Sequence, residues 1–335
     1  NVAYDNEKQG FSLYASIGYT AKGDKGNKIT LLDNKFSFTP VQDAFNVYIT
    51  TTTNSNNFDY KNANLYIGGC TFSTPQTPTV KFNHLKIYEQ LKYESIVFTK
   101  CNCVQQGPDT VSVPDIEINN FNFNCDPNGV CTPGAPVTPG PSAKPDDDGY
   151  TKTDRIDSPG SALELEKAKF TDIKSEGKQG GAIRIAEPVV DCTIINCKFT
   201  SCTAKTGGAM YISYTGGSTH ELLIKKTIFT DCSSTENGGA LYIYISQENT
   251  HSATIKECTF TSNKAGYNGG AIYANTRDSF ILKHCSFDGN QAKIGSSLWL
   301  KVGYRSEKDP TYDFAHVLSN SFTFTPSGEE SNVYI

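Results

Sequence analysis

Two aspartates in the second half of the chain occupy equivalent places in a recurring pattern, two residues after a phenylalanine. They are Asp172 after Phe170 and Asp231 after Phe229, while Ser201 holds the same place in the intervening copy. Enzymes that cleave acidic polysaccharides need several carboxylates converging on one face, with Ca²⁺ and a basic residue in lyases. Because a serine separates the two aspartates, we expect no catalytic residues here.

Two histidines also share a place in neighbouring copies of the pattern. His220 and His251 each lie nine residues before a phenylalanine, so they are expected to stack on each other. A Zn²⁺ site needs further ligands, and the flanking copies place Val190 and Asp278 there. Two imidazoles are too few for such a site. A solvated turn is therefore favoured, with no metal and no cofactor.

Eleven cysteines are more than a cytosolic chain usually carries, which favours an oxidising compartment. One pair flanks the turn sequence Asp-Pro-Asn-Gly, and two other pairs occupy shared places in adjacent copies. Strands about 4.8 Å apart lie within the reach of a disulfide. Buried thiols packed as small apolar groups are the favoured alternative for the stacked pairs. The disulfide candidates are Cys125 with Cys131, Cys202 with Cys232, and Cys258 with Cys285.

Aromatic residues recur at an outward position that follows a glycine-rich turn, where the first copy has Arg184. Alternation with aliphatic residues places the rings outside and the aliphatic side chains in the core. Contiguous exposed aromatics often bind carbohydrate or protein, so this stripe is the candidate binding surface. The alternative is that the rings stack on each other and only stabilise the sheet. The stripe consists of Tyr211, Tyr242, Tyr273, Trp299 and Tyr334.

The elements that must position these residues follow one repeated frame. An aliphatic residue is followed three positions later by a small residue or cysteine, and two positions after that by phenylalanine. Residues two apart in a strand face the same side, so the last two are expected to be buried together. The five copies are Leu165/Ala168/Phe170, Ile194/Cys197/Phe199, Ile224/Thr227/Phe229, Ile255/Cys258/Phe260 and Leu282/Cys285/Phe287, each followed by a turn of the type GGAIRI, GGAMYI, GGALYI, GGAIYA or GSSLWL.

The spacing between successive phenylalanines is 29, 30, 31 and 27 residues. A period of this length, with strands and no helical pattern, excludes most α-solenoids and βα solenoids. It predicts an all-β fold, a right-handed parallel β-helix with coils of about 25 to 31 residues, each rising about 4.8 Å. A two-layer sandwich is the competing fold, but it would not require turn motifs to recur in one order.

The glycine-rich turns and the Phe-x-x-Asn motif together resemble the repeats of the polymorphic membrane protein (Pmp) family. The second motif occurs as Phe260-Thr-Ser-Asn263 and Phe287-Asp-Gly-Asn290, and cysteine replaces the asparagine in two other copies. The resemblance covers roughly residues 165–300. It implies a secreted or surface-displayed β-helix protein that acts in adhesion.

Three segments are expected along the chain. Residues 1–130 form N-terminal coils with the looser frames Ile67/Cys70/Phe72, Tyr93/Ile96/Phe98 and Ile118/Phe121/Phe123. Residues 131–150 form a proline-rich linker or loop, and residues 151–335 form C-terminal coils. Residues 319–335 echo residues 33–49, because both contain Phe-x-Phe-Thr-Pro and Asn-Val-Tyr-Ile. This echo favours one unit of a tandem array with a period of about 286 residues, the alternative being two similar ends of one finished chain.

Charge and hydropathy limit the partners. The net charge is −5, and no run of basic residues forms a stripe, so nucleic acid is not expected. No apolar segment approaches the roughly 20 residues of a membrane-spanning helix. We expect a secreted or cell-surface protein with a structural, rod-forming and adhesive role. Its partners would be copies of itself and surface glycans or proteins, and a β-helix that binds or degrades polysaccharide is the alternative.

Overall fold

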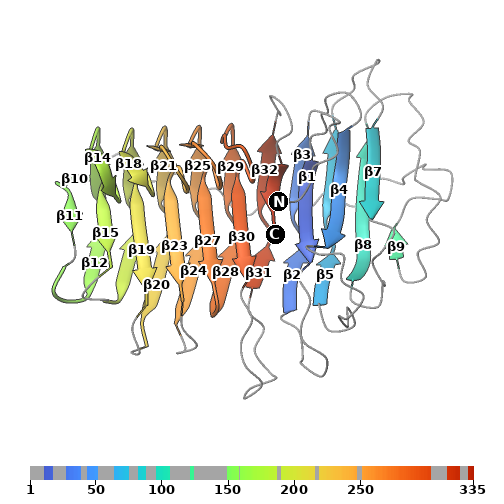
Figure 1. Cartoon of the computed structure of the whole chain (residues 1–335), viewed down its shortest axis with the longest axis horizontal. Helices are drawn as coiled ribbons and strands as arrows, with labels where there is room; N and C mark the ends of the chain where they lie inside the picture. The colour runs from blue at the N-terminus through green and yellow to red at the C-terminus, as the bar shows by residue number, and fades with distance from the viewer. Residues whose placement is uncertain are drawn as a thin grey trace.

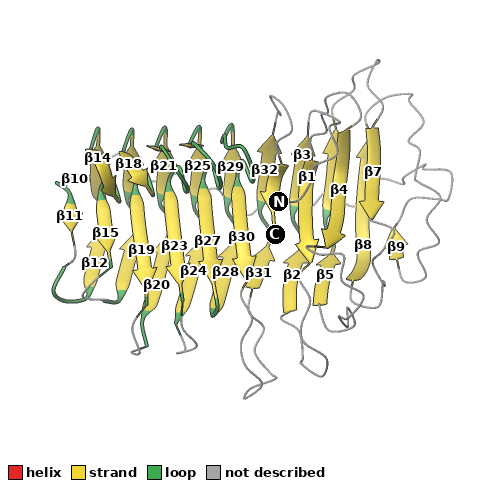
Figure 2. Ribbon diagram, in the orientation of Figure 1, coloured by secondary structure: helices red, strands yellow, loops and turns green. Residues whose placement is uncertain are grey.

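The computed structural model describes residues 11–17, 28–38, 44–51, 64–74, 82–87, 96–105, 121–123, 149–157, 159–186, 190–215, 219–246, 251–302, 315–324 and 331–335. Within these ranges all regular structure is β-strand, and no helix long and apolar enough to cross a membrane occurs. The strands stack side by side into a rod (Figure 1), and loops join them at its edges (Figure 2). Cys125 and Cys131, as well as residues 131–148 of the proline-rich segment, lie outside the described residues.

The rod has three long walls of parallel strands. The first wall is a 10-stranded sheet. In spatial order it contains β11 (Ile156–Asp157), β15 (Ile183–Ile185), β19 (Met210–Tyr214), β23 (Leu241–Ile245), β27 (Ile272–Thr276), β30 (Leu298–Val302), β33 (Ser331–Tyr334), β1 (Phe11–Ile17), β4 (Ala44–Thr51) and β7 (Phe82–Ile87).

The second and third walls together form a 19-stranded sheet that is bent at a sharp turn in most coils. The second wall contains β12 (Leu163–Glu166), β16 (Cys192–Ile195), β20 (Glu221–Lys225), β24 (Ser252–Lys256), β28 (Ser279–Lys283), β31 (Ala315–Leu318), β2 (Lys28–Leu32), β5 (Asn64–Gly68) and β8 (Ile96–Gln105). The third wall contains β10 (Thr151–Lys152), β13 (Ala168–Thr171), β17 (Lys198–Thr200), β21 (Ile228–Thr230), β25 (Thr259–Thr261), β29 (Ser286–Asp288), β32 (Ser321–Phe324), β3 (Lys35–Phe38) and β6 (Thr71–Thr74), and β9 (Phe121–Phe123) pairs with β8.

A short fourth sheet widens four coils between the third wall and the first. It contains β14 (Lys174–Gln179), β18 (Thr203–Thr206), β22 (Ser233–Ser234) and β26 (Lys264–Ala265). The described strand pairs between coils are parallel, and the predicted frame is in register: Phe199 lies between Phe170 and Phe229. These rings are buried and stack with centroids 4.8 and 4.9 Å apart, which matches the spacing of adjacent strands.

Single residues in the left-handed region make the corner between the second and third walls. Asn196 has φ 51° and Glu257 has φ 57°, and the next residue, Cys197 or Cys258, turns inward. This conformation is uncommon outside glycine and tolerated best by asparagine and aspartate. The recurring glycine pairs mark other corners of the coil, so the sequence did not predict these non-glycine corners.

At the glycine-rich corners the two glycines have different tasks. Gly238 has φ 68°, a conformation that favours glycine. Gly239 instead faces the neighbouring coil, where a Cβ would lie 2.0 Å from the carbonyl oxygen of Gly270. The last such corner has Ser296 in the second place, against which Gly270 packs. The backbones of adjacent coils therefore approach each other closely at these turns.

The two halves of the rod meet at a junction in its middle, where β1 pairs with β33 and where β32 lies beside β3 (Figure 1). There β31 pairs with β2 and β32 pairs with β3, so the echoing segments 319–324 and 33–38 belong to adjacent coils. The first wall contains one extra strand at this point, because β1 lies between β33 and β4. The rod therefore continues across two segments that are distant in sequence.

Two of the looser N-terminal frames were wrong. Ile67 pairs with Phe98, which therefore occupies the aliphatic place, and Phe72 pairs with Cys103. The cause is β8, a ten-residue strand that spans the second and third walls. Phe121 in turn pairs with Phe98. The frame Ile67/Cys70/Phe72 is confirmed, since Phe36 pairs with Phe72 and Leu31 with Ile67.

Candidate binding faces

The predicted aromatic stripe exists as one continuous column on the outer face of the first wall. Its members pair in register from β19 to β33. They point outward, because their strand neighbours Met210, Leu241 and Ile272 are buried. Successive ring centroids are 4.9, 4.8, 4.3 and 5.8 Å apart, and interplanar angles do not exceed 8°. The column is Tyr211, Tyr242, Tyr273, Trp299 and Tyr334, and Tyr14 of β1 extends it.

This stacking covers the ring faces, which are the surfaces that would pack on a sugar ring. The five rings of the stripe are half-buried and Tyr14 is buried, and because neighbouring faces cover each other, mainly ring edges remain for contact. Burial raises the pKa of Tyr242 and of Tyr273 above the ordinary tyrosine value. Their hydroxyls therefore stay protonated at neutral pH. The column therefore has the geometry expected if the rings stack on each other to stabilise the sheet. The tyrosine hydroxyls along its outer edge can still form hydrogen bonds.

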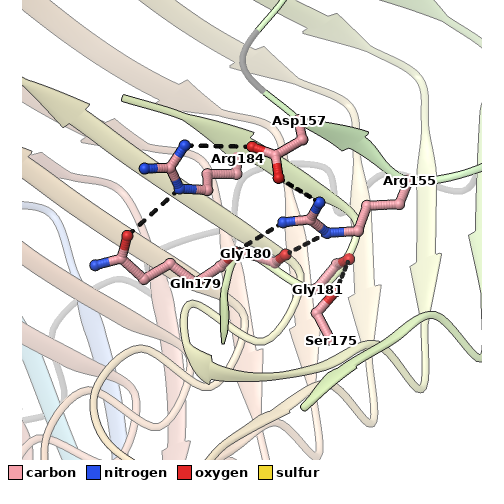
Figure 3. Close-up of polar contacts among 7 residues, drawn as sticks. All are labelled: Arg155, Asp157, Ser175, Gln179, Gly180, Gly181 and Arg184. Atoms are coloured by element: carbon pink, nitrogen blue, oxygen red, sulfur yellow. Dashed lines mark hydrogen bonds and ion pairs between the residues drawn. The ribbon is translucent and has the colours of Figure 1, made fainter. Parts of the chain in front are cut away.

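Charged side chains close one end of the same wall, at β11 (Figure 3). Arg184 donates to the carboxylate of Asp157 at 3.3 Å and to Gln179 Oε1 at 3.4 Å. Arg155 forms an ion pair with Asp157 and donates to the carbonyl oxygens of Gln179 and Gly180, both at 3.2 Å. The hydrogen bond from Arg155 is the main cause that lowers the pKa of Asp157. Arg155 thus covers backbone carbonyl oxygens at the β11 end of the rod.

The candidate carboxylates do not come together. Asp172 and Asp231 are left-handed corner residues with φ 56° and 52°, and Ser201 occupies the corner between them with φ 51°. Aspartate and serine at these places have a structural explanation, because short polar side chains favour turns. The arrangement provides no pair of facing carboxylates at these corners.

The histidines stack as predicted, with ring centroids 5.8 Å apart, and they take part in hydrogen bonds with backbone N–H groups. The N–H of His220 donates to His251 Nδ1 at 3.0 Å, and the N–H of His251 donates to Asp278 Oδ2 at 2.8 Å. His251 and Asp278 are buried rather than solvated. Within the described ranges no group of three His, Cys, Asp or Glu side chains could hold a metal ion.

The stacked cysteines are buried free thiols in the structure. Cys202, Cys232, Cys258 and Cys285 all have free sulfhydryl groups, and the N–H of Cys258 donates to Cys285 Sγ at 3.4 Å. Burial raises the pKa of Cys232 and Cys285. The thiols therefore pack as buried core residues, which is the favoured alternative, and Cys232 Sγ donates to the carbonyl oxygen of Phe199 at 3.7 Å.

A row of lysines on the second wall was missed. Lys225, Lys256 and Lys283 come from β20, β24 and β28 and lie in register. These lysines form no run in the sequence, because the fold aligns residues that are 31 and 27 positions apart. Each lies four residues before a phenylalanine of the frame, a signal available in the sequence. We call these three residues the lysine column.

Comparison with known proteins supports the architecture. Residues 156–304 match the family model described as the right-handed beta helix region. No curated protein and no solved structure matches the chain. The fold is therefore an all-β, right-handed parallel β-helix, and the match supports a β-helix family without distinguishing among the functions that such proteins have.

Proposed function

We propose that this protein is a rod-forming structural β-helix of a cell surface or extracellular layer, whose outer faces serve adhesion. The Pmp-type resemblance of residues 165–300 supports the surface location and the adhesive role. The observation that carries the structural role is the junction in the middle of the rod. Buried columns continue there between segments that are not neighbours in the chain.

The junction is as well packed as contacts within one half. Phe36 stacks on Phe322 with centroids 5.2 Å apart and planes at 11°. The side chain of Asn34 accepts from Asn320 N and Nδ2, both at 3.0 Å, and donates to the carbonyl of Val317 at 2.7 Å. Asn290 makes the same set of bonds to its neighbouring coil, so the junction reproduces an ordinary coil contact.

Because two copies of the chain carry the same complementary surfaces, the junction can also form between molecules. The N-terminal half of one copy would then stack on the C-terminal half of another. Such domain swapping builds longer rods without any new contact. Exchange at the junction is better supported than pairing through the β11 end, where strands are short and Arg155 covers backbone acceptors.

The length of the segment between the halves provides the test. The ten strands of the first wall span roughly 43 Å at about 4.8 Å per step. Deleting residues 127–147 leaves four residues between Phe123 and Gly149, which reach about 18 Å at most. One molecule could then no longer close its own junction. We expect this variant to form rods longer than one molecule in negative-stain electron microscopy.

The matched control replaces residues 127–147 with a Gly/Ser segment of equal length, which keeps the reach. It should behave like the natural chain, with short rods when dilute and longer rods as concentration rises. If the deletion variant is a folded monomer by light scattering, or the natural chain shows single-length rods at every concentration, the rod-forming role is contradicted.

A further inference from the structure

The lysine column lies on the outer face of the second wall. In the three strands the residues just before these lysines, Ile224, Ile255 and Leu282, are fully buried, so the lysines point outward. Their ammonium groups are carried on strands about 4.8 Å apart. A continuous basic strip therefore runs parallel to the rod axis, although the chain as a whole has a net charge of −5.

The column differs from the other charged contacts between coils. Elsewhere opposite charges lie within reach of each other, as in Arg184 with Asp157 at 3.3 Å, Lys205 with Glu236 at 3.4 Å, and Lys226 with Glu257 at 3.9 Å. In the lysine column the flanking positions are Ile195 and Leu318, and no described acidic side chain forms an ion pair with it.

Stacking like charges has a cost that an anionic ligand would remove. Like charges a few ångströms apart repel each other even in bulk water, and like charges directly opposite each other destabilise a sheet. Beside the lysines, Leu223 and Ile281 point outward from the same wall and are half-buried. Thr254 lies between them in register, so the face combines regularly spaced cations with two separate apolar side chains.

We propose that the lysine column binds an acidic polysaccharide whose chain lies along the rod axis. Repeated sulfate or carboxylate groups would meet successive ammonium groups, and apolar faces of the sugar rings would cover Leu223 and Ile281. No Phe, Tyr or Trp ring that could stack on a base points outward from β20, β24 or β28 beside the lysines, which favours polysaccharide over nucleic acid. This inference names the ligand for the adhesive part of the proposed function and rests on that part alone.

The test is a binding titration of the full chain with dextran sulfate and with polygalacturonate, at 50 and 200 mM salt. The variant Lys225→Gln, Lys256→Gln, Lys283→Gln removes the column. The control variant Lys174→Gln, Lys178→Gln, Lys264→Gln removes the same charge from exposed positions on the fourth sheet. We expect the column variant to bind at least tenfold more weakly than the natural chain, and the control to lose less than twofold.

The two probes distinguish sulfate from carboxylate as the preferred anion. Equal losses in both variants, or no binding of either polymer at 50 mM salt, would overturn the proposal. Equal or tighter binding of a 20-base-pair DNA duplex would replace it with a nucleic-acid site. Rod length in electron microscopy is independent of this titration, so failure of the polysaccharide site and failure of rod formation are separately visible.

Discussion

At the scale of single residues, adjacent coils pack so closely at the glycine-rich corners that almost no side chain fits there. Gly239 packs against the carbonyl of Gly270, and Gly208 packs in the same way against Gly239. The glycine pairs were evident in the sequence, because they recur at fixed offsets. The non-glycine corner residues were not, since Lys167, Asn196 and Glu257 share a backbone conformation and no chemistry.

Gly239→Ala should be among the most destabilising single changes in the chain. The added Cβ would lie 2.0 Å from a backbone oxygen, and a coil can move away only by breaking its strand pairing. Overpacking costs about 1–3 kcal/mol where side chains can adjust, so we expect about 3 kcal/mol or more in urea unfolding. Ser296→Ala is the control, because that position already carries a Cβ. Comparable losses in both variants would contradict this explanation.

Buried thiols make stability depend on alkaline pH. Burial is the main cause that raises the pKa of Cys192 to about 12, above the ordinary value of 9.0. A raised thiol pKa stabilises the fold fully below pH 9, and this contribution is lost as pH rises toward 12. The free energy of unfolding should therefore fall faster from pH 9 to 11 in the natural chain than in Cys192→Ala. The expected difference is on the order of 2 kcal/mol, and parallel curves would refute it.

At the scale of elements, repetition made the C-terminal half predictable. Five copies of one frame determined which residues share a column, and the structure confirms that register from Phe170 to Phe287. In the N-terminal half, β8 runs through the corner where other coils turn, so spacing from one phenylalanine to the next no longer identified equivalent places. Only strand pairing reveals that register.

The outward columns show a second limit of sequence reasoning. The aromatic column was predicted because its members follow an obvious glycine motif. The lysine column lies within the repeated frame, one residue after its aliphatic position, but its alignment depends on coil lengths of 31 and 27 residues being absorbed outside the strands. Whether a ring face is covered by its neighbour is likewise a matter of side-chain stacking, which spacing alone does not determine.

At the scale of the whole molecule, the order of coils in space differs from their order in the chain. The rod runs from β11 to β33 and then continues through β1 toward β7. The similarity of residues 33–38 and 319–324 has a physical use in this arrangement. Like residues stack on like across the junction, with Phe36 on Phe322 and Asn34 on Asn320.

A circular permutant tests this order directly. It joins Ile335 to Asn1 and opens the chain between Gly140 and Pro141, so that coils follow one another along the rod. The hydrogen bond from Ile335 N to Tyr14 O at 2.9 Å places Ile335 beside β1. A segment as long as residues 1–10 can span the distance from Ile335 to Phe11. We expect a folded protein that unfolds in one transition at a denaturant midpoint no lower than that of the natural chain.

In the permutant, residues 1–10 link the two halves directly across the junction. We therefore expect that it no longer exchanges halves with another copy. Its rods should stay one molecule long at concentrations where the natural chain elongates, as measured by light scattering and electron microscopy. Two separate unfolding transitions would show that the halves do not form one rod. Elongation equal to that of the natural chain would show that the copies associate through the outer ends instead.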